Sequence, residues 1–407
     1  MLRRINDFVT TLPFWLIAVT MAAGGIACIV GCMLWFGATF DYTLQSVLTG
    51  SILLGIVTGV LGCFVTLKRQ SLVGDVLAHA ALPGVVIAFL IAGSGLSVLL
   101  VGAAIAGWLG LQVVSLILDT TRLKQDTALG IVLATFFGLG ISILSYTQGR
   151  EDAGRVGLDK FFFGQAATIL GSDVLIISGI TVIVLVIIIA FWKEFTLSTF
   201  DPEFAMTNGF AVRMYDLLLS SLVTITIVTG LQLAGVVLMA GMLVAPAVAA
   251  RQWTDDLGEM VILSAIFGAI AGGLGAMLSG IGWGRPTGPM IIALAAMITF
   301  GSLVIAPARG MLWDWLQRWL DRHRFETENL LSDLYRFAER NQKKDYVLEE
   351  KLLIGLRGWF AYIGLRDLQR NGLITRKDSG WALTDEGYSR AEAEHQKRVQ
   401  QQNQENA

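Results

Sequence analysis

The sequence predicts an all-α polytopic membrane protein with nine or ten transmembrane helices, followed by a small C-terminal α+β domain. Of its 407 residues, 54% are hydrophobic and only 15% are charged, whereas soluble globular chains carry about 25% charged residues. Charges are sparse from Leu12 to about Ala308 and dense after Trp313. This change in composition predicts a transmembrane domain over 1–310, a cytoplasmic domain over 311–395 and a disordered polar tail over 396–407.

Ten stretches are apolar over about 20 residues, the length that crosses the hydrocarbon core of a bilayer as a helix. They are 14–36, 47–67, 75–93, 97–118, 127–147, 172–192, 212–231, 234–250, 259–280 and 288–306. The stretch 212–250 also fits one span followed by a broken or re-entrant piece, which would reduce the number of spans to nine.

Lysine and arginine residues mark the expected cytoplasmic side, where they are enriched in membrane proteins. With ten spans, one side collects Arg3, Arg4, Lys68, Arg69, Arg122, Lys124, Lys193, Arg213, Arg251 and Arg309. The opposite loops at 37–46, 93–96 and 232–234 contain none. The exceptions are Arg150, Arg155, Lys160 and Arg285. We expect a multi-pass protein of the plasma (inner) membrane with both termini in the cytoplasm.

Glycine is abundant inside the predicted spans, and the chain has 45 glycines. Gly55 and Gly59 lie in one span, and Gly268 and Gly272 lie in another. Small residues at helical spacing let membrane helices approach closely, because lipid supplies no hydrophobic drive for helix association. The glycines therefore predict a tightly packed helix bundle.

Asp75 and His79 are ionisable residues in an otherwise apolar span. They are four positions apart, so the carboxylate and the imidazole lie on one face of a helix. Ionisable side chains inside a membrane are costly and as a rule face a cavity or a partner. The sequence Pro83-Gly84 follows and predicts a break in the helix. Two plainer explanations are open, namely that Asp75 caps the helix and that His79 is a hydrogen-bonded core histidine.

Imidazole and carboxylate together suit a divalent transition metal such as zinc, manganese or iron. Two ligands are too few for tight binding, so a dimer around a central pathway would supply two Asp75 and two His79 side chains. A transport site must exchange its ion, and modest affinity agrees with that role. We expect a transported metal and no permanently bound cofactor. The donor atoms do not decide which metal is preferred.

The segment Ser198–Phe210 is predicted to form one short amphipathic helix on the cytoplasmic side. Asp201 is placed to cap it, Pro202 stands at the first helical position and Gly209 lies near its end. The helix is too short to cross a membrane and lacks the basic face of a lipid-surface anchor. We therefore expect it to dock into a partner protein.

After Trp313 the pattern is typical of a winged-helix domain. Helices are expected at Leu330–Arg340, Glu349–Ile363 and Leu365–Gly372, and strands at Leu373–Ile374 and Trp381–Leu383 form a two-stranded wing. Basic residues that could meet phosphates are Arg357, Arg366, Arg370, Arg376 and Lys377. Acidic residues are interspersed among them, so nucleic-acid binding is doubtful, and contact with protein is the alternative.

The segment Leu67–Gly84 resembles permease subunits of the manganese/zinc/iron ABC importers, which carry a Gly-Asp-x-Leu-Ser-His-x-x-Leu-Pro-Gly pattern. Four further stretches are similar to that family: Asp126–Ile131, Phe161–Gly164, Phe200–Ala205 and Pro286–Pro289. Together these stretches cover roughly 45–306. The chain departs at Ala78, where the family has serine, and so lacks a hydroxyl beside the two ligands.

The resemblance implies roles for residues and partners. Asp75 and His79 match the family's metal-binding pair in the translocation path. The coupling segment that contacts the ATPase matches Phe200, Asp201, Pro202, Glu203, Ala205 and Gly209. No ATP-binding loop occurs in the sequence, so the implied partners are a separate cytoplasmic ABC ATPase, an extracytoplasmic metal-binding protein, membrane lipid and a second permease chain, identical or paralogous. The C-terminal domain resembles winged-helix domains of the diphtheria-toxin-repressor type through Leu368–Ile374 and Leu383–Gly387.

The leading hypothesis is a permease subunit, not an enzyme, that imports a divalent transition metal by alternating access while a separate ATPase hydrolyses ATP. The alternative is a membrane-anchored, metal-responsive regulator with a DNA-binding C-terminal domain. An anchor does not need ten spans, and the coupling segment would then have no explanation.

Overall fold

A computed structural model describes 14–36, 42–93, 95–148, 171–281, 286–306 and 310–312 of the membrane-spanning part, and 329–341, 359–377 and 380–393 of the remainder. It also describes residues 343, 346–349, 352–353, 355 and 396. The chain forms two compact units, Met1–Gly310 and Met311–Ala407. We describe each unit by itself. The predicted tail over 396–407 lies outside the described residues, apart from residue 396.

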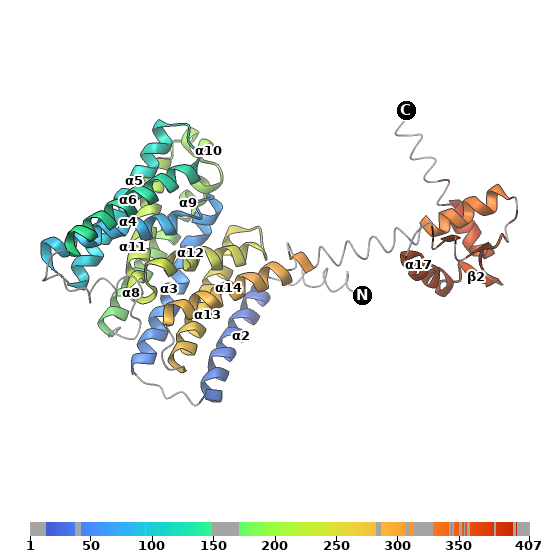
Figure 1. Ribbon diagram of the computed structural model, residues 1–407, viewed down its shortest axis with the longest axis horizontal. Helices are drawn as coiled ribbons and strands as arrows, with labels where there is room; N and C mark the ends of the chain where they lie inside the picture. The colour runs from blue at the N-terminus through green and yellow to red at the C-terminus, as the bar shows by residue number, and fades with distance from the viewer. Residues whose placement is uncertain are drawn as a thin grey trace. The chain divides into compact units, whose positions relative to one another are not determined.

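The first unit is a helix bundle whose helices coincide with the ten predicted spans (Figure 1). They are α2 (Phe14–Phe36), α3 (Tyr42–Leu67), α4 (Val73–Ala92), α5 (Leu96–Thr120), α6 (Gln125–Gln148), α8 (Gly171–Ala190), α11 (Val212–Ala234), α12 (Val236–Arg251), α13 (Leu257–Ile281) and α14 (Thr287–Ile305). Within the described residues, eight helices are long and apolar enough to cross a membrane. The prediction of a polytopic, mainly helical membrane protein is confirmed.

The other two apolar helices are α2 and α12. With 16 residues, α12 is about 24 Å long, which is shorter than a hydrocarbon core of about 30 Å. It follows α11 directly through the buried Gly235, whose φ of 81° is in the region that favours glycine. This geometry fits the re-entrant alternative for 212–250, and the number of crossings stays a prediction.

Close contact between α3 and α13 organises the bundle. A Cβ atom added at Gly55 would overlap the backbone carbonyl of Gly268, and the hydroxyl of Ser264 donates a 2.8 Å hydrogen bond to the Gly59 carbonyl. Only glycine lets the two backbones come this close. The glycines of these spans therefore allow the tight packing that their spacing predicted.

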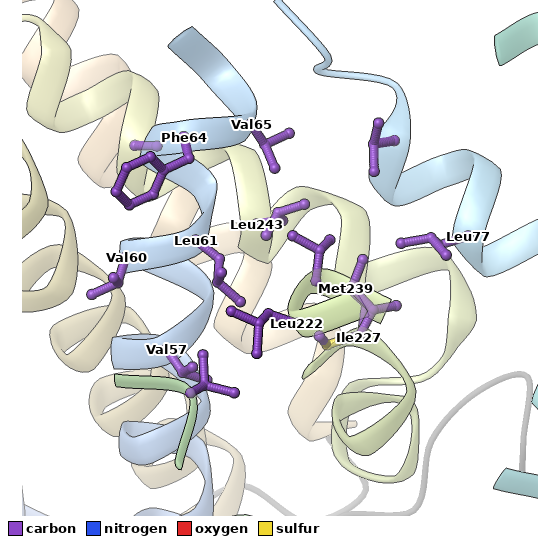
Figure 2. Packing of buried hydrophobic residues seen from close by; sticks show 14 of the residues in the cluster. Val57, Val60, Leu61, Phe64, Val65, Leu77, Leu222, Ile227, Met239 and Leu243 are labelled. Atoms are coloured by element: carbon purple, nitrogen blue, oxygen red, sulfur yellow. The ribbon is translucent and has the colours of Figure 1, made fainter. Parts of the chain in front are cut away.

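Helices α11 and α12 contact both α3 and α4 and so join the two sides of the bundle. Figure 2 shows the cluster where they meet, with Leu61 of α3 near Leu222 of α11 and Leu243 of α12. Leu77 of α4 belongs to the same cluster. The central helix of the bundle is thus connected by buried side chains to α4, the helix that carries Asp75 and His79.

The second unit combines helices with a three-stranded antiparallel sheet. A helix over 329–340 precedes β1 (Leu348–Glu349), α17 (Trp359–Arg370), β2 (Ile374–Lys377), β3 (Gly380–Leu383) and a helix over 385–393. The strand order is β1-β3-β2, with Leu348 opposite Trp381 and Ile374 opposite Leu383. The buried core includes Leu334, Leu365, Leu368 and Trp381.

Two predictions for this unit are wrong in detail. The predicted helix over Glu349–Ile363 begins inside β1, which pairs with β3, so the sheet has three strands instead of two. The predicted boundary at 363–365 does not exist, because α17 continues from Trp359 to Arg370. The two-residue β1 is too short to show an alternating pattern, and its partner is distant in sequence.

Candidate functional site

Asp75 and His79 both lie in the N-terminal half of α4. Asp75 is in the first turn, and the N-cap residue Leu72 makes no side-chain capping hydrogen bond. The first turn of a helix favours a carboxylate, because its free N–H groups carry partial positive charge. Within the described residues, no hydrogen bond or ion pair holds the side chain of Asp75 or of His79. Neither a capping role nor a hydrogen-bonded core histidine is therefore seen.

Asp75 and His79 occupy a half-buried stripe of a helix that is otherwise enclosed at this level. The intervening Val76, Leu77 and Ala78 are buried, as are Gly74 and Ala80, whereas Asp75 and His79 are only partly covered. A Cβ added at Gly74 would lie 2.7 Å from Cα of Ala240, so α4 presses against α12 on another side. In this part of α4, the two polar side chains thus lie on the side that the described residues leave accessible.

The imidazole of His79 contacts one aromatic ring. The ring of Phe137 on α6 lies 4.9 Å from the imidazole between centroids, at an interplanar angle of 79°. This edge-to-face contact limits the orientations of the imidazole. Among the described residues no hydrogen bond occupies an imidazole nitrogen, which leaves a nitrogen donor for a ligand.

Pro83 does not break α4 as predicted. The helix continues through Pro83 and Gly84 to Ala92. A Cβ at Gly84 would overlap the carbonyl of Gly102, so close packing against α5 holds the segment helical. Pro83 has no N–H, and the carbonyl of His79, four residues earlier, therefore loses its usual helical donor. A backbone oxygen is left beside the two polar side chains.

A single chain does not complete a metal site around these residues. Within the described residues, no group of three or more His, Cys, Asp and Glu side chains could hold a metal ion. Phe161–Gly164, as well as His323 and His395, lie outside the described residues. The arrangement offers one carboxylate, one imidazole and one free carbonyl, which are nitrogen and oxygen donors suited to a weakly held divalent ion.

The predicted helix over Ser198–Phe210 is in fact two helices. Helix α9 (Trp192–Phe200) ends at Asp201, where α10 (Pro202–Thr207) begins. Asp201 caps α10 as predicted, since its Oδ1 accepts a 2.9 Å hydrogen bond from the backbone N–H of Phe204. Pro202 is at the start of α10, and Gly209, with φ of 83°, ends the segment. The proline after Asp201 prevents α9 from continuing.

The coupling segment exposes large apolar side chains at one end of the bundle. Phe200, Phe204 and Met206 are each more than half exposed, Glu203 is exposed and Ala205 is buried. Sequence reasoning singled out Phe200 and missed Phe204 and Met206. The available signal was the pair of phenylalanines four positions apart, Phe200 at the end of α9 and Phe204 in α10. Exposed aromatic residues on a short helix outside the spans indicate a protein-binding surface.

Comparison with known proteins identifies the family of this chain. Residues 40–306 match the ABC 3 transport family. The chain belongs to the ABC 3 transport family. It is accordingly a multi-pass membrane permease subunit of an ABC transporter, and ATP hydrolysis belongs to a separate subunit.

Two relatives show how far this ABC 3 protein matches others. It is 41% identical to the manganese transport system membrane protein MntC of Bacillus subtilis over 345 residues, 84% of this chain and 79% of MntC. It is 43% identical to the zinc transport system membrane protein TroC of Treponema pallidum over 280 residues, 68% of this chain and 94% of TroC. The match to MntC is longer than 306 residues and therefore extends into the C-terminal unit.

Solved structures agree with the fold. PsaBC from Streptococcus pneumoniae in complex with Fab matches 70% of this chain and 97% of its own chain, with a TM-score of 0.59 and 31% identity. A metal-chelate type ABC transporter in an inward-facing conformation matches 70% of this chain with a TM-score of 0.52 and 14% identity, which supports the fold alone.

Proposed function

We propose that this ABC 3 permease imports a divalent transition metal, namely manganese, zinc or iron, across the plasma (inner) membrane. The observation that carries the proposal is the accessible stripe of α4, where a carboxylate and an imidazole stand together without partners among the described residues. Relatives named for manganese and for zinc support the substrate class. Because those names differ, the class is proposed without choosing one metal.

Asp75 and His79 are the proposed ligands in the translocation path. One chain supplies too few donors for a complete coordination shell, so a second permease chain, identical or paralogous, brings an equivalent pair to the same level. Incomplete coordination by each half keeps the ion exchangeable. Alternating access then exposes this level to each side of the membrane in turn.

The coupling segment is the proposed docking surface for the cytoplasmic ABC ATPase, through Phe200, Asp201, Pro202, Glu203, Ala205 and Gly209. The exposed aromatic side chains and the capped, rigid α10 support this role. An extracytoplasmic metal-binding protein delivers the ion at the opposite end of the bundle. Apolar residues on the outside of the bundle contact membrane lipid.

The positions of the lysine and arginine residues support an orientation of the permease in the membrane. Lys68, Asp119, Gln125 and Asp216 line one cavity, so the ends of α3 and α5 and the starts of α6 and α11 meet at the same end of the bundle. Lys68, Arg122, Lys124 and Arg213 lie at or next to these helix ends, which supports assigning this end to the cytoplasm. The coupling segment leads directly into α11 and lies at that end, and we place the C-terminal unit in the cytoplasm too.

The C-terminal unit, over 311–395, is proposed to be a winged-helix module of the type seen in metal-dependent repressors. The β1-β3-β2 sheet with α17 before its hairpin supports this fold. A second candidate function, binding of duplex DNA, is favoured by one observation: Arg366, Gln369 and Arg370 are exposed on α17. Helix faces of this composition contact phosphates and base edges.

One reconstitution tests the transport proposal. The chain and its ATPase subunit are placed in proteoliposomes, and uptake of Mn²⁺, Zn²⁺ and Fe²⁺ is measured with ATP, without ATP, and with an ATPase that cannot hydrolyse ATP. We expect hydrolysis-dependent uptake of at least one of the three ions. A functional ATPase complex that moves none of them would refute the proposal.

A truncation tests whether the C-terminal unit regulates transport, and a binding titration tests the second candidate. The chain without residues 320–407 should still transport metal, but its transport should no longer respond to metal on the cytoplasmic side. Full-length protein in nanodiscs is also titrated with labelled duplex DNA at several salt concentrations. Binding that weakens as salt rises and is lost in Arg366→Ala/Arg370→Ala supports the DNA role. Equal binding by that variant contradicts it.

A further inference from the structure

A partly buried ion pair joins the end of α3 to the start of α11. The Lys68 ammonium forms an ion pair with the Asp216 carboxylate. The two side chains differ in exposure, 11% for Lys68 and 48% for Asp216. A buried ammonium is strongly disfavoured without a partner, whereas a half-exposed carboxylate can be solvated by water. Lys68 therefore depends on the ion pair more than Asp216 does, because its ammonium has little access to water.

The turn that carries Lys68 leads directly into the helix with the proposed metal ligands. Hydrogen bonds from Gln70 N–H to the Val65 carbonyl (2.9 Å) and from Arg69 N–H to the Thr66 carbonyl (3.0 Å) close the end of α3. Arg69 has φ of 58°, a left-handed conformation that costs free energy for any residue except glycine. Strained residues of this kind are common at switch segments. Lys68 thus pins a short, strained turn just before α4.

Asp216 is connected to the coupling segment by packing. Its neighbour Tyr215 lies against Phe195 of α9, with ring centroids 6.4 Å apart. Phe195 is fully buried and also packs on Phe64 of α3, at 6.0 Å. The ion pair therefore lies next to an aromatic cluster that fixes α9 to α3 and α11. A displacement of α9 and α10 therefore also moves the residues packed around Lys68 and Asp216.

The pair also borders a small cavity whose lining is partly polar and partly aliphatic. A volume of about 190 Å³ is lined by Lys68 and Asp216 together with Asp119, Gln125, Ser115 and Ser220. The polar part of the lining gives the ammonium and the carboxylate alternative hydrogen-bonding groups, and the cavity has room for water, when the two separate. The pair can thus open at lower cost than one enclosed in an apolar core.

We infer that Lys68 and Asp216 are positioning residues that transmit movement of the coupling segment to α4 and so to Asp75 and His79. The inference rests on the proposed function. When the ATPase moves α9 and α10, the link through Asp216 and Lys68 carries the α3–α4 turn with α11. Neither residue contacts the metal. Their role is to keep ATP hydrolysis and metal movement in step.

The chain offers a matched control in the same helical turn. Arg213 of α11 pairs with Asp119 of α5 at 3.5 Å, and both side chains are mainly exposed, at 79% and 56%. Exposed ion pairs contribute little. Lys68→Met removes the buried charge, and Arg213→Met removes an exposed one from almost the same place. A difference between them reports on the buried link and not on charge in general.

The experiment measures uptake of Mn²⁺ and Zn²⁺ together with ATP hydrolysis by the full complex in proteoliposomes. For Lys68→Met we expect normal assembly, continued ATP hydrolysis and about a tenfold fall in metal moved per ATP. Arg213→Met should keep the wild-type ratio. The double variant Lys68→Asp/Asp216→Lys should recover part of the ratio, which a loss of general stability does not explain.

The outcomes separate this inference from the transport proposal. Metal uptake by the wild-type complex tests the transport proposal, and the ratio in the variants tests the link. An unchanged ratio in Lys68→Met, or an equal fall in Arg213→Met, overturns the inference. If Lys68→Met fails to assemble, the charge-swapped variant decides: recovered assembly with a recovered ratio supports the link, and recovered assembly with full uncoupling overturns it.

Discussion

The ring of Phe137 meets the imidazole of His79 edge to face, 4.9 Å away between centroids and at 79°. The contact joins α6 to the proposed metal-binding stripe of α4. It restrains the imidazole, which makes no hydrogen bond to the described residues. Phe137 is itself 38% exposed, so the contact lies at the edge of the accessible stripe and not in the core of the bundle.

Phe137→Ala should lower metal uptake without abolishing it. The imidazole then samples orientations that do not face the ion, at a cost of about 0.5–1.5 kcal/mol, which corresponds to a several-fold lower affinity for the ion. Uptake rates against metal concentration in proteoliposomes give the change. Ile141→Ala, at a similarly exposed position of α6, is the control and should behave like wild type. Equal effects of the two variants contradict a role of the ring contact.

Pro83→Ala should stabilise the protein and weaken the site. The new N–H can bond the carbonyl of His79, restoring a helical hydrogen bond that proline prevents. We expect a higher unfolding temperature and a lower affinity for metal. Pro246→Ala in α12 is the matched control, because it can restore a bond away from Asp75 and His79. A Pro83→Ala complex with unchanged affinity shows that the His79 carbonyl takes no part.

Gly55→Leu and Gly268→Leu should destabilise the bundle. At both positions a side chain meets the backbone of the facing helix, and overpacking costs about 1–3 kcal/mol even where flexible side chains can move. Thermal unfolding in detergent measures the loss. Gly179→Leu in α8 is the control, since no atom lies within 4 Å of the added Cβ. Similar unfolding temperatures for all three variants would disprove the proposed close packing.

Phe204→Ala should weaken assembly with the ATPase by about tenfold or more, as expected for an aromatic anchor in an interface. The side chain is 54% exposed on α10 and does not support the fold. Affinity is measured by titrating labelled ATPase onto the permease in nanodiscs. Ile176→Ala, at an exposed position of α8, should bind normally. Undiminished binding by Phe204→Ala removes α10 from the docking surface.

Much of the fold could be predicted from the sequence because the bilayer imposes a length on each helix. Runs of about 20 apolar residues stand out without knowledge of tertiary contacts, and every predicted span coincides with a helix. Asp201 and Pro202 correctly predicted the start of α10, whereas Ser198–Phe200 were wrongly joined to the same helix and belong to the end of α9. In the second unit, β1 was missed because its two residues gain their strand character only from pairing with β3.

The site could be predicted in part. The spacing of Asp75 and His79 places both on one helix face, which follows from helix geometry alone. Phe137 and the Lys68–Asp216 pair could not be found in this way. Both contacts join residues that are far apart in the sequence. No sequence pattern around Phe137, Lys68 or Asp216 indicates what each of them contacts. Only the packing of α4 against α6, and of α3 against α11, brings them together.

The most direct test of the central claim is ATP-driven metal uptake by Asp75→Ala and His79→Ala. Each variant is assembled with the ATPase in proteoliposomes, and size-exclusion chromatography checks that assembly is intact. We predict that both complexes form normally and that uptake of the transported ion is abolished. Wild-type uptake by both variants would contradict the assignment of Asp75 and His79 as the metal site.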